Sequence, residues 1–575
     1  TGVAVRNGAT FENNATIHID SAGGQAYFKV QGGIIKNYGT FTLGSGAVKE
    51  YTPGSKPTGK EVGGVNINAP AGATRATITR NGNPVTPVTI SNVVGQRNPL
   101  TSSIGMYVDT LRGTNPIGGL IPSGEADLII GSEASKVTTA KDIEVNGEIL
   151  KPYNKAIAAN PQITNWKIYS GAFTWIATGT IDSATQQIKN LYLSKIPYTK
   201  FAGNESTPVD KKDTYNFLDG LEQRYGVEKL GSRENQVFQK LNGIGNNEEV
   251  LFYQATDEMM GHQYANVQQR INATSKVLDK EFDYLRSEWQ TASKDSNKVK
   301  VFGTRGEYKT DTAGVIDYKN YAYGVAYVHE DEDIKLGKGI GWYAGIVHNT
   351  FKFKDIGKSK EEQLQGKVGL LKSVPFDDNN SLNWTISGDI FAGYNKMSRK
   401  FLVVDEVFNA RGRYNTYGVA LKNELGKDFR LTENISLRPY GAIKLEYMKL
   451  GKVKEKSGEI RLDVKDSHYI SVRPEVGVDL NYKYILASGK IITARLGTAY
   501  EDELGKVAKA NNKAKVAHTS ADWFNLPKEK EDRKGNVKTD FSLGVEGEIL
   551  GGTANIGYDT KGHNMRAGVG FRVIF

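Results

Sequence analysis

The sequence contains no cysteine, little proline and no long apolar run, and each absence excludes a class of protein. Its 575 residues include no Cys and 16 Pro. Without cysteine there is no disulfide scaffold, no thiol nucleophile and no cysteine-ligated zinc or iron–sulfur site. The mean hydropathy is −0.46, and no apolar run of about 18 residues occurs that could form a membrane-spanning helix. A membrane β-barrel is not excluded, because its strands alternate apolar and polar residues and therefore contain no long apolar run.

Glycine and tyrosine are abundant, and basic residues exceed acidic ones. The 64 Gly and 29 Tyr favour strands and tight turns, and the formal net charge is +10. The lysines are spread along the chain beside Glu and Asp, without a basic helix or an aromatic-rich RNA motif. We therefore expect lysines on solvated loops and no nucleic-acid partner. The chain begins at Thr1 without Met or a signal peptide, and we expect a processed product or an expressed segment.

The N-terminal 200 residues carry a loose repeat of an Asn/Gly turn followed by a short strand. The pattern occurs at 7–11, 14–17 and 37–41. Units that recur roughly every 20 to 25 residues are typical of a parallel β-solenoid, in which each coil buries its apolar residues on the next. An ordinary β-sandwich is the alternative. We expect a solenoid-like passenger stem over 1–100 and a β-rich cap over 101–208.

The segment 209–297 has helical spacing and almost no strand signal. Its longest helical run, 247–292, contains one glycine, Gly261, and no proline. The part from 263 to 292 is polar between its apolar residues, which suits a helix inside a water-filled channel. The candidate residues for contact with a channel wall are Gln268, Gln269, Arg270, Asn272 and Lys276.

From residue 298 to 575 the hydrophobic period changes to two. In 537–549, for example, apolar residues such as Phe541 and Leu543 occupy one parity, and polar residues such as Lys538 and Ser542 occupy the other. Strands of about nine or more residues with one apolar and one charged face fit a closed membrane barrel, where lipid meets one face and water the other. The expected strands cover 299–308, 316–328, 339–353, 363–374, 382–396, 413–425, 436–449, 468–482, 490–502, 537–549, 553–559 and 565–575.

The connections between these strands alternate in length. The expected short ones are 329–338, 375–381 and 550–552, and the expected long ones are 397–412, 450–467 and 503–536. Outer-membrane barrels have short periplasmic turns and longer external loops. The fold class is therefore mainly β, a 12-stranded antiparallel barrel. The inward parity supplies candidate lumen-wall residues, which are Arg438, Lys444, Glu446, Arg473 and Glu475.

A C-terminal barrel entered by a helix and preceded by a β-solenoid resembles the monomeric (type Va) autotransporters of Gram-negative outer membranes. The segment 253–288 is similar to the family's polar helix, 299–303 to its first barrel strand, and 566–575 to its closing strand with a terminal aromatic residue. The stretch 104–107 resembles the family's stem and autochaperone region more weakly. The resemblance covers nearly the whole chain and implies a helix that threads the barrel lumen.

The resemblance also implies a function and a set of partners. The barrel would export and anchor a surface passenger, and the stem favours a large adhesin for cell–cell or host attachment, with residues 1–200 outside the cell. The implied partners are outer-membrane lipid, periplasmic chaperones, the barrel-assembly machinery and a surface receptor bound through the passenger. We expect a monomer without a cofactor. Phe571, Val573 and Phe575 alternate at the C-terminus and are expected to be the signal that the assembly machinery recognises by strand addition.

The sequence contains no recognisable catalytic or metal-binding motif. The Gly-Lys-Ser at 357–359 lacks the first glycine of a phosphate loop, and neither a nucleophile elbow nor a His-Glu-x-x-His motif occurs. The acidic runs 330–333 and 377–380 are expected to be solvated turns rather than cation sites. We therefore predict that the chain is not an enzyme and binds no metal.

Some autotransporters cut their own chain inside the barrel through an asparagine side chain. The nearest Asn-Asn pair, Asn246-Asn247, lies far before the first expected strand, and Asn266 and Asn272 lack an Asn neighbour. We therefore expect an uncleaved passenger. Two other functions stay open, namely a plugged outer-membrane pore or transporter, and a translocator whose passenger has an enzymatic domain upstream of this chain.

Overall fold

The computed structural model describes two compact units. It covers all residues except 1, 7–8, 22–25, 32–33, 45, 53–78, 81–82, 85–105, 119–123, 159–162, 183, 186, 204–209, 246–247, 289–295, 508–510, 531–534 and 575. One unit comprises Thr1–Asp257 with Leu402–Glu406 and Thr519–Asp522, and the other comprises the remaining residues from Glu258 to Phe575. The expected boundaries at 100/101 and 208/209 lie outside the described residues, and the four-part division stays a prediction.

Short parallel strands stack on one another at the start of the first unit. The pairs are β1 (Val3–Arg6) with β4 (Ala26–Gln31) and β4 with β7 (Ala47–Thr52), β2 (Thr10–Asn13) with β5 (Ile34–Asn37), and β3 (Thr16–Ile19) with β6 (Thr40–Leu43). Paired residues of β2 and β5 are 24 positions apart, and Asn13 donates to the side chain of Asn37 at 2.8 Å. Phe28 and Phe41 are buried in the core beneath. One coil thus stacks on the next at the spacing that the sequence repeat predicts.

The rest of the first unit combines two small sheets with helices. One sheet is parallel, with β10 (Met106–Val108), β11 (Gly124–Ile130) and β13 (Ile163–Ser170), and the other is antiparallel, with β12 (Asp142–Glu144), β15 (Ile188–Lys195) and β14 (Trp175–Ile181). The helical elements are η1 (Glu133–Val137), η2 (Gly147–Leu150), α1 (Lys151–Ala158), η3 (Tyr198–Phe201), α2 (Lys211–Arg224) and α3 (Arg233–Asn242), and a two-residue ladder joins β8 (Thr79–Arg80) to β9 (Asn83–Pro84). Of the stretch expected to resemble the autochaperone region, Ile104 and Gly105 lie outside the described residues, and Met106 begins β10.

A buried ion pair joins α2 to the antiparallel sheet. The Lys195 ammonium lies 2.5 Å from a Glu222 carboxylate oxygen and 3.4 Å from the ring centre of Tyr198. Burial lowers the pKa of Lys195 to about 8, and the Glu222 carboxylate opposes this shift. The ammonium is therefore largely charged at neutral pH, and its ion pair with Glu222 is lost as the pH rises above about 8.

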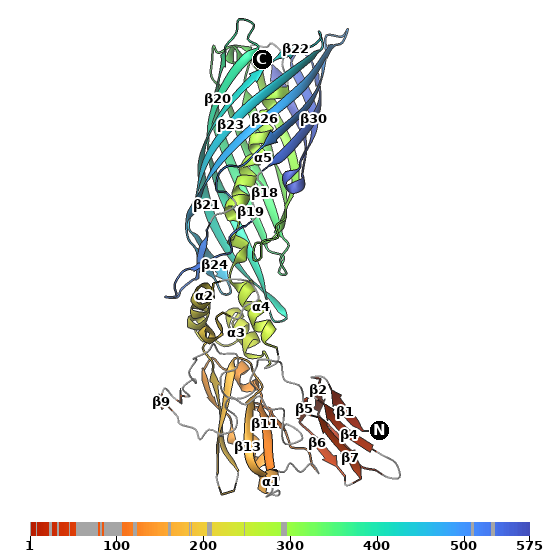
Figure 1. Cartoon of the computed structure of the whole chain (residues 1–575), viewed down its shortest axis with the longest axis vertical. Coiled ribbons are helices and arrows are strands. Elements are labelled where there is room, and N and C mark those ends of the chain that lie inside the picture. The colour runs from red at the N-terminus through yellow and green to blue at the C-terminus, as the bar shows by residue number, and fades with distance from the viewer. Residues whose placement is uncertain are drawn as a thin grey trace. The chain divides into compact units, whose positions relative to one another are not determined.

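Within the described residues, twelve long strands close into an antiparallel barrel (Figure 1). They are β16 (Ser296–Tyr308), β17 (Tyr318–His329), β18 (Gly341–Phe353), β19 (Lys360–Pro375), β20 (Leu382–Val403), β21 (Glu406–Lys427), β23 (Ile435–Leu450), β26 (Ser467–Ile485), β27 (Ile491–Glu501), β30 (Asn536–Glu546), β31 (Leu550–Asp559) and β32 (Asn564–Ile574). Pairing of β16 with β32 closes the ring, so no backbone edge is left in the hydrocarbon. The expected 12-stranded antiparallel barrel is confirmed.

The connections differ from the sequence prediction at four places. The expected loop 397–412 is a hairpin instead, because β20 and β21 each run for 22 residues and leave only Val404 and Asp405 between them. The expected loops 450–467 and 503–536 contain short strands, which are β24 (Val453–Gly458), β25 (Leu462–Val464), β28 (Lys513–Val516) and β29 (Phe524–Asn525). The expected turn 550–552 is wrong, since β30 ends at Glu546 and Leu550 already begins β31. Along the β20–β21 hairpin and in β24 and β28, buried and exposed positions alternate as they do in the ring, so the period alone does not separate these segments from the barrel strands.

The turns at the other end of the barrel also contain short elements. The turn between β17 and β18 contains α6 (Glu332–Lys335), and β22 (Phe429–Arg430) pairs with the start of β23. The last turn, between β31 and β32, lies at the opposite end and contains η5 (Lys561–His563).

The helical run 247–292 is not one helix. It consists of α4 (Glu249–Met259), a single turn η4 (His262–Tyr264) and α5 (Val267–Glu288). Gly261 separates them with φ of +82°, a left-handed conformation that glycine adopts without steric cost. Among the helices of the described residues, none is long and apolar enough to cross a membrane.

Candidate functional site in the barrel lumen

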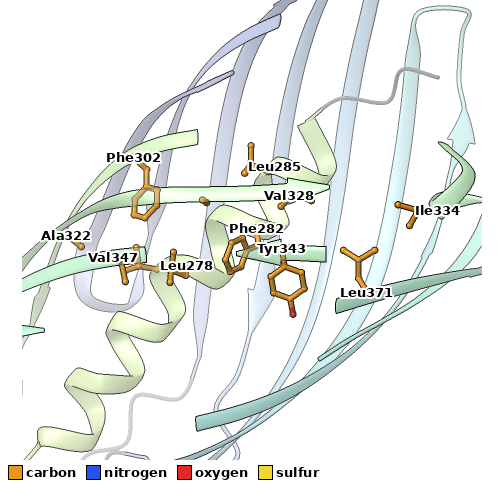
Figure 2. Packing of buried hydrophobic residues seen from close by; sticks show 12 residues of the cluster. Leu278, Phe282, Leu285, Phe302, Ala322, Val328, Ile334, Tyr343, Val347 and Leu371 are labelled. Carbon is orange, nitrogen blue, oxygen red and sulfur yellow. The ribbon is translucent and has the colours of Figure 1, made fainter. Parts of the chain in front are cut away.

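The helix α5 lies inside the barrel and packs its apolar face against one part of the wall (Figures 1 and 2). Leu278, Phe282 and Leu285 are buried in a cluster with inward-facing residues of β16–β19. The Phe282 and Tyr343 rings lie 4.8 Å apart between centres. The remaining wall residues of this cluster are Phe302, Ala322, Ala326, Val328, Val347 and Leu371, together with Ile334 of the β17–β18 turn. The inner surface that faces this part of α5 is therefore apolar, whereas Lys300 of β16 and Lys367 of β19 keep the charged character that the alternation predicts.

Asp279 projects from another face of α5 and joins three strands of the wall. Its carboxylate lies 2.6 Å from the Lys367 ammonium of β19, 2.5 Å from the Lys444 ammonium of β23 and 2.8 Å from the Arg473 guanidinium of β26. All four side chains are at most one-tenth exposed. Buried charges are tolerated when they are paired and hydrogen-bonded, so this cluster fixes the height and rotation of the helix in the lumen.

Further ion pairs connect α5 to the wall along its length. Each joins a helix residue to an opposite charge, and the pairs are Arg270–Glu361, Lys276–Glu501, Lys280–Asp559, Glu281–Lys300, Asp283–Lys422 and Arg286–Glu330. The partners come from β19, β27, β31, β16, β21 and the turn after β17. Charge complementarity therefore surrounds the helix instead of lying on one side.

The five lumen-helix candidates all lie at this interface. Gln268 donates to Ser467 at 2.7 Å and to Asn512 at 2.6 Å. Asn272 donates to Glu446 at 3.3 Å. Gln269 accepts a hydrogen bond from Tyr318, Arg270 pairs with Glu361, and Lys276 lies 3.7 Å from Glu501.

The five lumen-wall candidates divide into two groups. Lys444, Glu446 and Arg473 meet α5, the first and last through Asp279 and Glu446 through Asn272 and Ser275. The other two bind wall residues, since Arg438 lies 2.7 Å from Glu424 and Glu475 lies 2.8 Å from Lys538. The sequence therefore predicts the inward parity of these positions but not their partners.

Sequence reasoning missed Asp279, Lys367 and Lys280. A signal for Asp279 was present, because the inward parity of three strands supplies Lys367, Lys444 and Arg473, and buried cations require an acid. Glu330 was also misjudged. It was expected in a solvated turn, but it is buried and its carboxylate lies 2.9 Å from Arg286.

Besides a pocket of about 50 Å³ at Asp279 and Phe282, two larger cavities border α5 in the described part of the chain. One of about 330 Å³ surrounds its C-terminal part and is bordered by Lys280, Arg286 and Arg438. The other, of about 240 Å³, lies beside its first turns and is bordered by Lys276 and Glu501, and Lys280 borders both. The helix thus packs its apolar face against β16–β19, and its charged residues pair with the other strands across the remaining space. Within the described ranges, no group of three or more His, Asp or Glu side chains could hold a metal ion.

The chain is held where it turns from α4 into the lumen. The Arg399 guanidinium binds the Glu455 carboxylate at 2.9 Å and the Met259 carbonyl at 3.1 Å. Tyr264 donates to Glu455 at 3.0 Å. A Cβ on Gly261 would lie 2.4 Å from the side chain of Leu462, so the turn fits closely under the β25 strand.

Two of the three residues expected to form the assembly signal, Phe571 and Val573, lie in the described part of the closing strand. Phe571 is 55% exposed on the outer surface, opposite Val299 of β16. Val573 faces Asn297 in the same ladder, and Phe575 lies outside the described residues.

Comparison with known proteins identifies the barrel. Residues 298–559 match the family model described as the autotransporter beta-domain. The chain is similar to the translocator domain of autotransporter NalP from Neisseria meningitidis, with 13% identity, a TM-score of 0.41, and coverage of 54% of this chain and 99% of that one. It is also similar to the transport unit of autotransporter AIDA-I from Escherichia coli, with 11% identity, a TM-score of 0.36, and coverage of 56% and 99%. No curated protein matches the chain in sequence.

The family model covers β16 to β31, nearly the complete ring of strands. Its match agrees with the strand number and the antiparallel closure described above. Residues 298–559 belong to the autotransporter β-domain family, and the barrel that they form is the outer-membrane translocator of a surface-exported passenger.

Proposed function

We propose that this chain is the membrane-anchored end of an uncleaved, adhesin-like autotransporter, in which α5 stays in the lumen after export. The observation that carries the proposal is the ring of ion pairs around α5, above all Asp279 with its three cations. A helix held from several strands at once resists withdrawal in either direction. It therefore connects whatever precedes it to the membrane.

The asparagines of the lumen segment support an uncleaved chain. Self-cleavage requires an asparagine side chain to attack its own peptide carbonyl. Neither Asn266 nor Asn272 is followed by a second asparagine, and the Asn266 side chain is held by the Ile316 carbonyl, to which it donates at 3.5 Å, and by Arg270, from which it accepts. Asn246 and Asn247 lie outside the described residues.

The stacked parallel strands support the adhesin part of the proposal. A coil that buries Phe28, Phe41 and Leu43 on its neighbours can be extended by further coils without a new core. Such a stem suits an extended surface structure whose receptor binds through the passenger. The alternatives are a passenger with an enzymatic domain and a pore in which α5 is only a plug.

Protease added to intact cells should remove residues 1–200 and leave a protected fragment of about the barrel's size. The stem is exposed outside the cell in this proposal, whereas the closed barrel is shielded by lipid. Immunoblots against tags placed before Val3 and in the 486–490 turn report the two parts. Full protection of the first tag would contradict surface exposure.

Cells that express the chain should also attach to one another or to host cells more than cells that express residues 298–575 alone, and equal attachment would contradict the adhesin role.

We also propose that Phe571, Val573 and Phe575 form the signal for the barrel-assembly machinery, after periplasmic chaperones have kept the chain unfolded. An edge strand can be recognised by strand addition, with alternate side chains giving specificity. Phe571 shares the outward face with Val569, and both are exposed. The alternative is that these residues only contact lipid and are not recognised by the assembly machinery.

Deletion of Phe575 should strongly lower the amount of folded barrel in outer membranes but leave refolding in detergent almost unchanged. The reason is that the machinery acts only in the cell. Phe541→Ala on β30 is the matched control, since Phe541 is 41% exposed on the outer face but far from the terminus. Heat-modified mobility on gels measures folding in both settings. Equal losses for the deletion and Phe541→Ala in cells would contradict the signal.

A further inference from the structure

Five consecutive barrel strands each carry an outward-facing basic residue at the end that holds the β20–β21 hairpin. They are Arg305 of β16, Lys319 of β17, Lys352 of β18, Lys360 of β19 and Lys396 of β20, and we call them the basic belt. Their parity is that of the exposed apolar residues of the same strands. Lys396, for example, lies on the same face of β20 as Ile390 and Tyr394, which are both exposed. None of the five points into the lumen network.

Three residues of the belt stand beside one another in register. Lys319 pairs with Lys352, and Lys352 pairs with Lys360 on the next strand. Like charges directly opposite each other destabilise a sheet. Two neighbouring carboxylates reduce this repulsion only in part. Glu362 pairs with Lys360 at 2.6 Å. Glu307 pairs instead with Lys309 and Lys354, which are not part of the belt.

Aromatic rings hold these cations at the edge of the apolar surface. The Arg305 guanidinium lies 5.9 Å and the Lys352 ammonium 5.3 Å from the ring centre of Tyr321. The Lys396 ammonium lies 5.7 Å from the ring centre of Tyr394. Tyrosines at this position form the interfacial girdle of membrane barrels. The belt therefore lies at the level of lipid headgroups, just beyond the hydrocarbon.

The opposite end of the same strands has a different outer surface. Its outward residues are largely apolar or aromatic, such as Trp342 and Leu370, which are 45% and 62% exposed. The outward lysine found there, Lys372, donates to the Gly337 carbonyl at 2.8 Å. On these five strands, the outward-facing positive charge is therefore concentrated at the external end, which faces the outer leaflet.

We propose that the basic belt binds the phosphate groups of an anionic glycolipid of the lipid A class in the outer leaflet. The inference uses the outer-membrane location of the barrel and is independent of the passenger's role. Ammonium and guanidinium groups form strong charge-assisted hydrogen bonds to phosphate, and several cations on adjacent strands match a headgroup with two phosphates. The acyl chains would lie on the apolar residues below, including Val325, Ile346 and Leu364, which are 40–49% exposed.

Native mass spectrometry of the full chain in detergent tests the proposal with defined probes. The probes are a hexa-acylated lipid A with two phosphates, the same lipid without phosphate, and phosphatidylglycerol. We expect one bisphosphorylated molecule to be retained about tenfold more tightly than either other lipid, since each basic residue adds to binding of an anionic headgroup. Equal retention of the phosphate-free lipid would overturn the proposal, and equal retention of phosphatidylglycerol would show that any anionic lipid suffices and overturn the glycolipid assignment.

The variants assign the binding to the belt. The combined substitutions Lys319→Gln, Lys352→Gln and Lys360→Gln should abolish the tenfold preference, and the corresponding Lys→Arg set should keep it. The matched control is Lys427→Gln, Arg430→Gln and Lys490→Gln at the opposite end, where all three are exposed. Heat-modified mobility confirms that each variant is folded. A preference that survives the Gln set, or that the opposite-end set removes equally, would overturn the assignment.

Discussion

A chain that begins at Lys298 should conduct ions on the order of tenfold better in planar bilayers than a chain that begins at residue 210, because a barrel of this size encloses water unless it is plugged. The shorter chain lacks α5, whose apolar face fills the space beside β16–β18 and whose charged residues reach β19, β23 and β26. In the longer chain, cavities of about 330, 240 and 50 Å³ lie beside the helix.

Both chains are refolded in the same detergent, and their heat-modified mobility is compared before the recordings. A Leu→Ala substitution at 278 in the longer chain serves as the matched control, because it enlarges the space on the apolar side without removing the helix. Its conductance should remain close to that of the unsubstituted chain. Equal conductance of the chains starting at 210 and 298 would show that α5 does not close the lumen.

Replacement of Asp279 by Ala should destabilise the barrel by about 3–5 kcal/mol, the cost of removing one partner from a buried charge cluster. Lys367, Lys444 and Arg473 would face one another, with Asp389 and Glu446 at 3.6–4.0 Å as the remaining carboxylates. Unfolding by denaturant in lipid vesicles, followed by tryptophan fluorescence, measures the loss.

Asp283→Ala is the matched control for this experiment. Asp283 also pairs with one wall lysine, Lys422 at 2.7 Å, but its side chain is 35% exposed and Glu424 lies 3.3 Å from the same lysine. Its loss should cost about 1 kcal/mol or less, as for solvent-screened pairs. A similar loss for both variants would mean that Asp279 is not the principal anchor of the helix.

The two-residue period specified the barrel strands because each strand meets lipid on one side and the lumen on the other. The inward positions of Lys444, Glu446 and Arg473 follow from this period, and so does the outward position of Phe571. The stacking of β2 on β5 likewise follows from a repeat of turns and strands, since Asn13 and Asn37 occupy equivalent places in consecutive coils.

Alternation does not reveal where lipid ends. The β20–β21 hairpin has the same pattern beyond the membrane, where Phe401 and Phe408 are buried against protein, so the expected loop 397–412 is strand. The break in the helical run depends both on a local residue and on residues that are distant in the sequence. Gly261 permits the turn, but Arg399 and Glu455, far along the chain, hold it.

The sequence by itself determined the class of barrel, its strand number and the polar character of the helix that enters it, because these depend on residue order within single elements. Only the tertiary structure decided that α5 packs its apolar face on β16–β18 and gathers three cations from three strands around Asp279. Those contacts join residues up to 194 positions apart. Periodicity indicates which way a side chain points, but the rotation of a helix inside a ring is set by the complementarity of the whole wall.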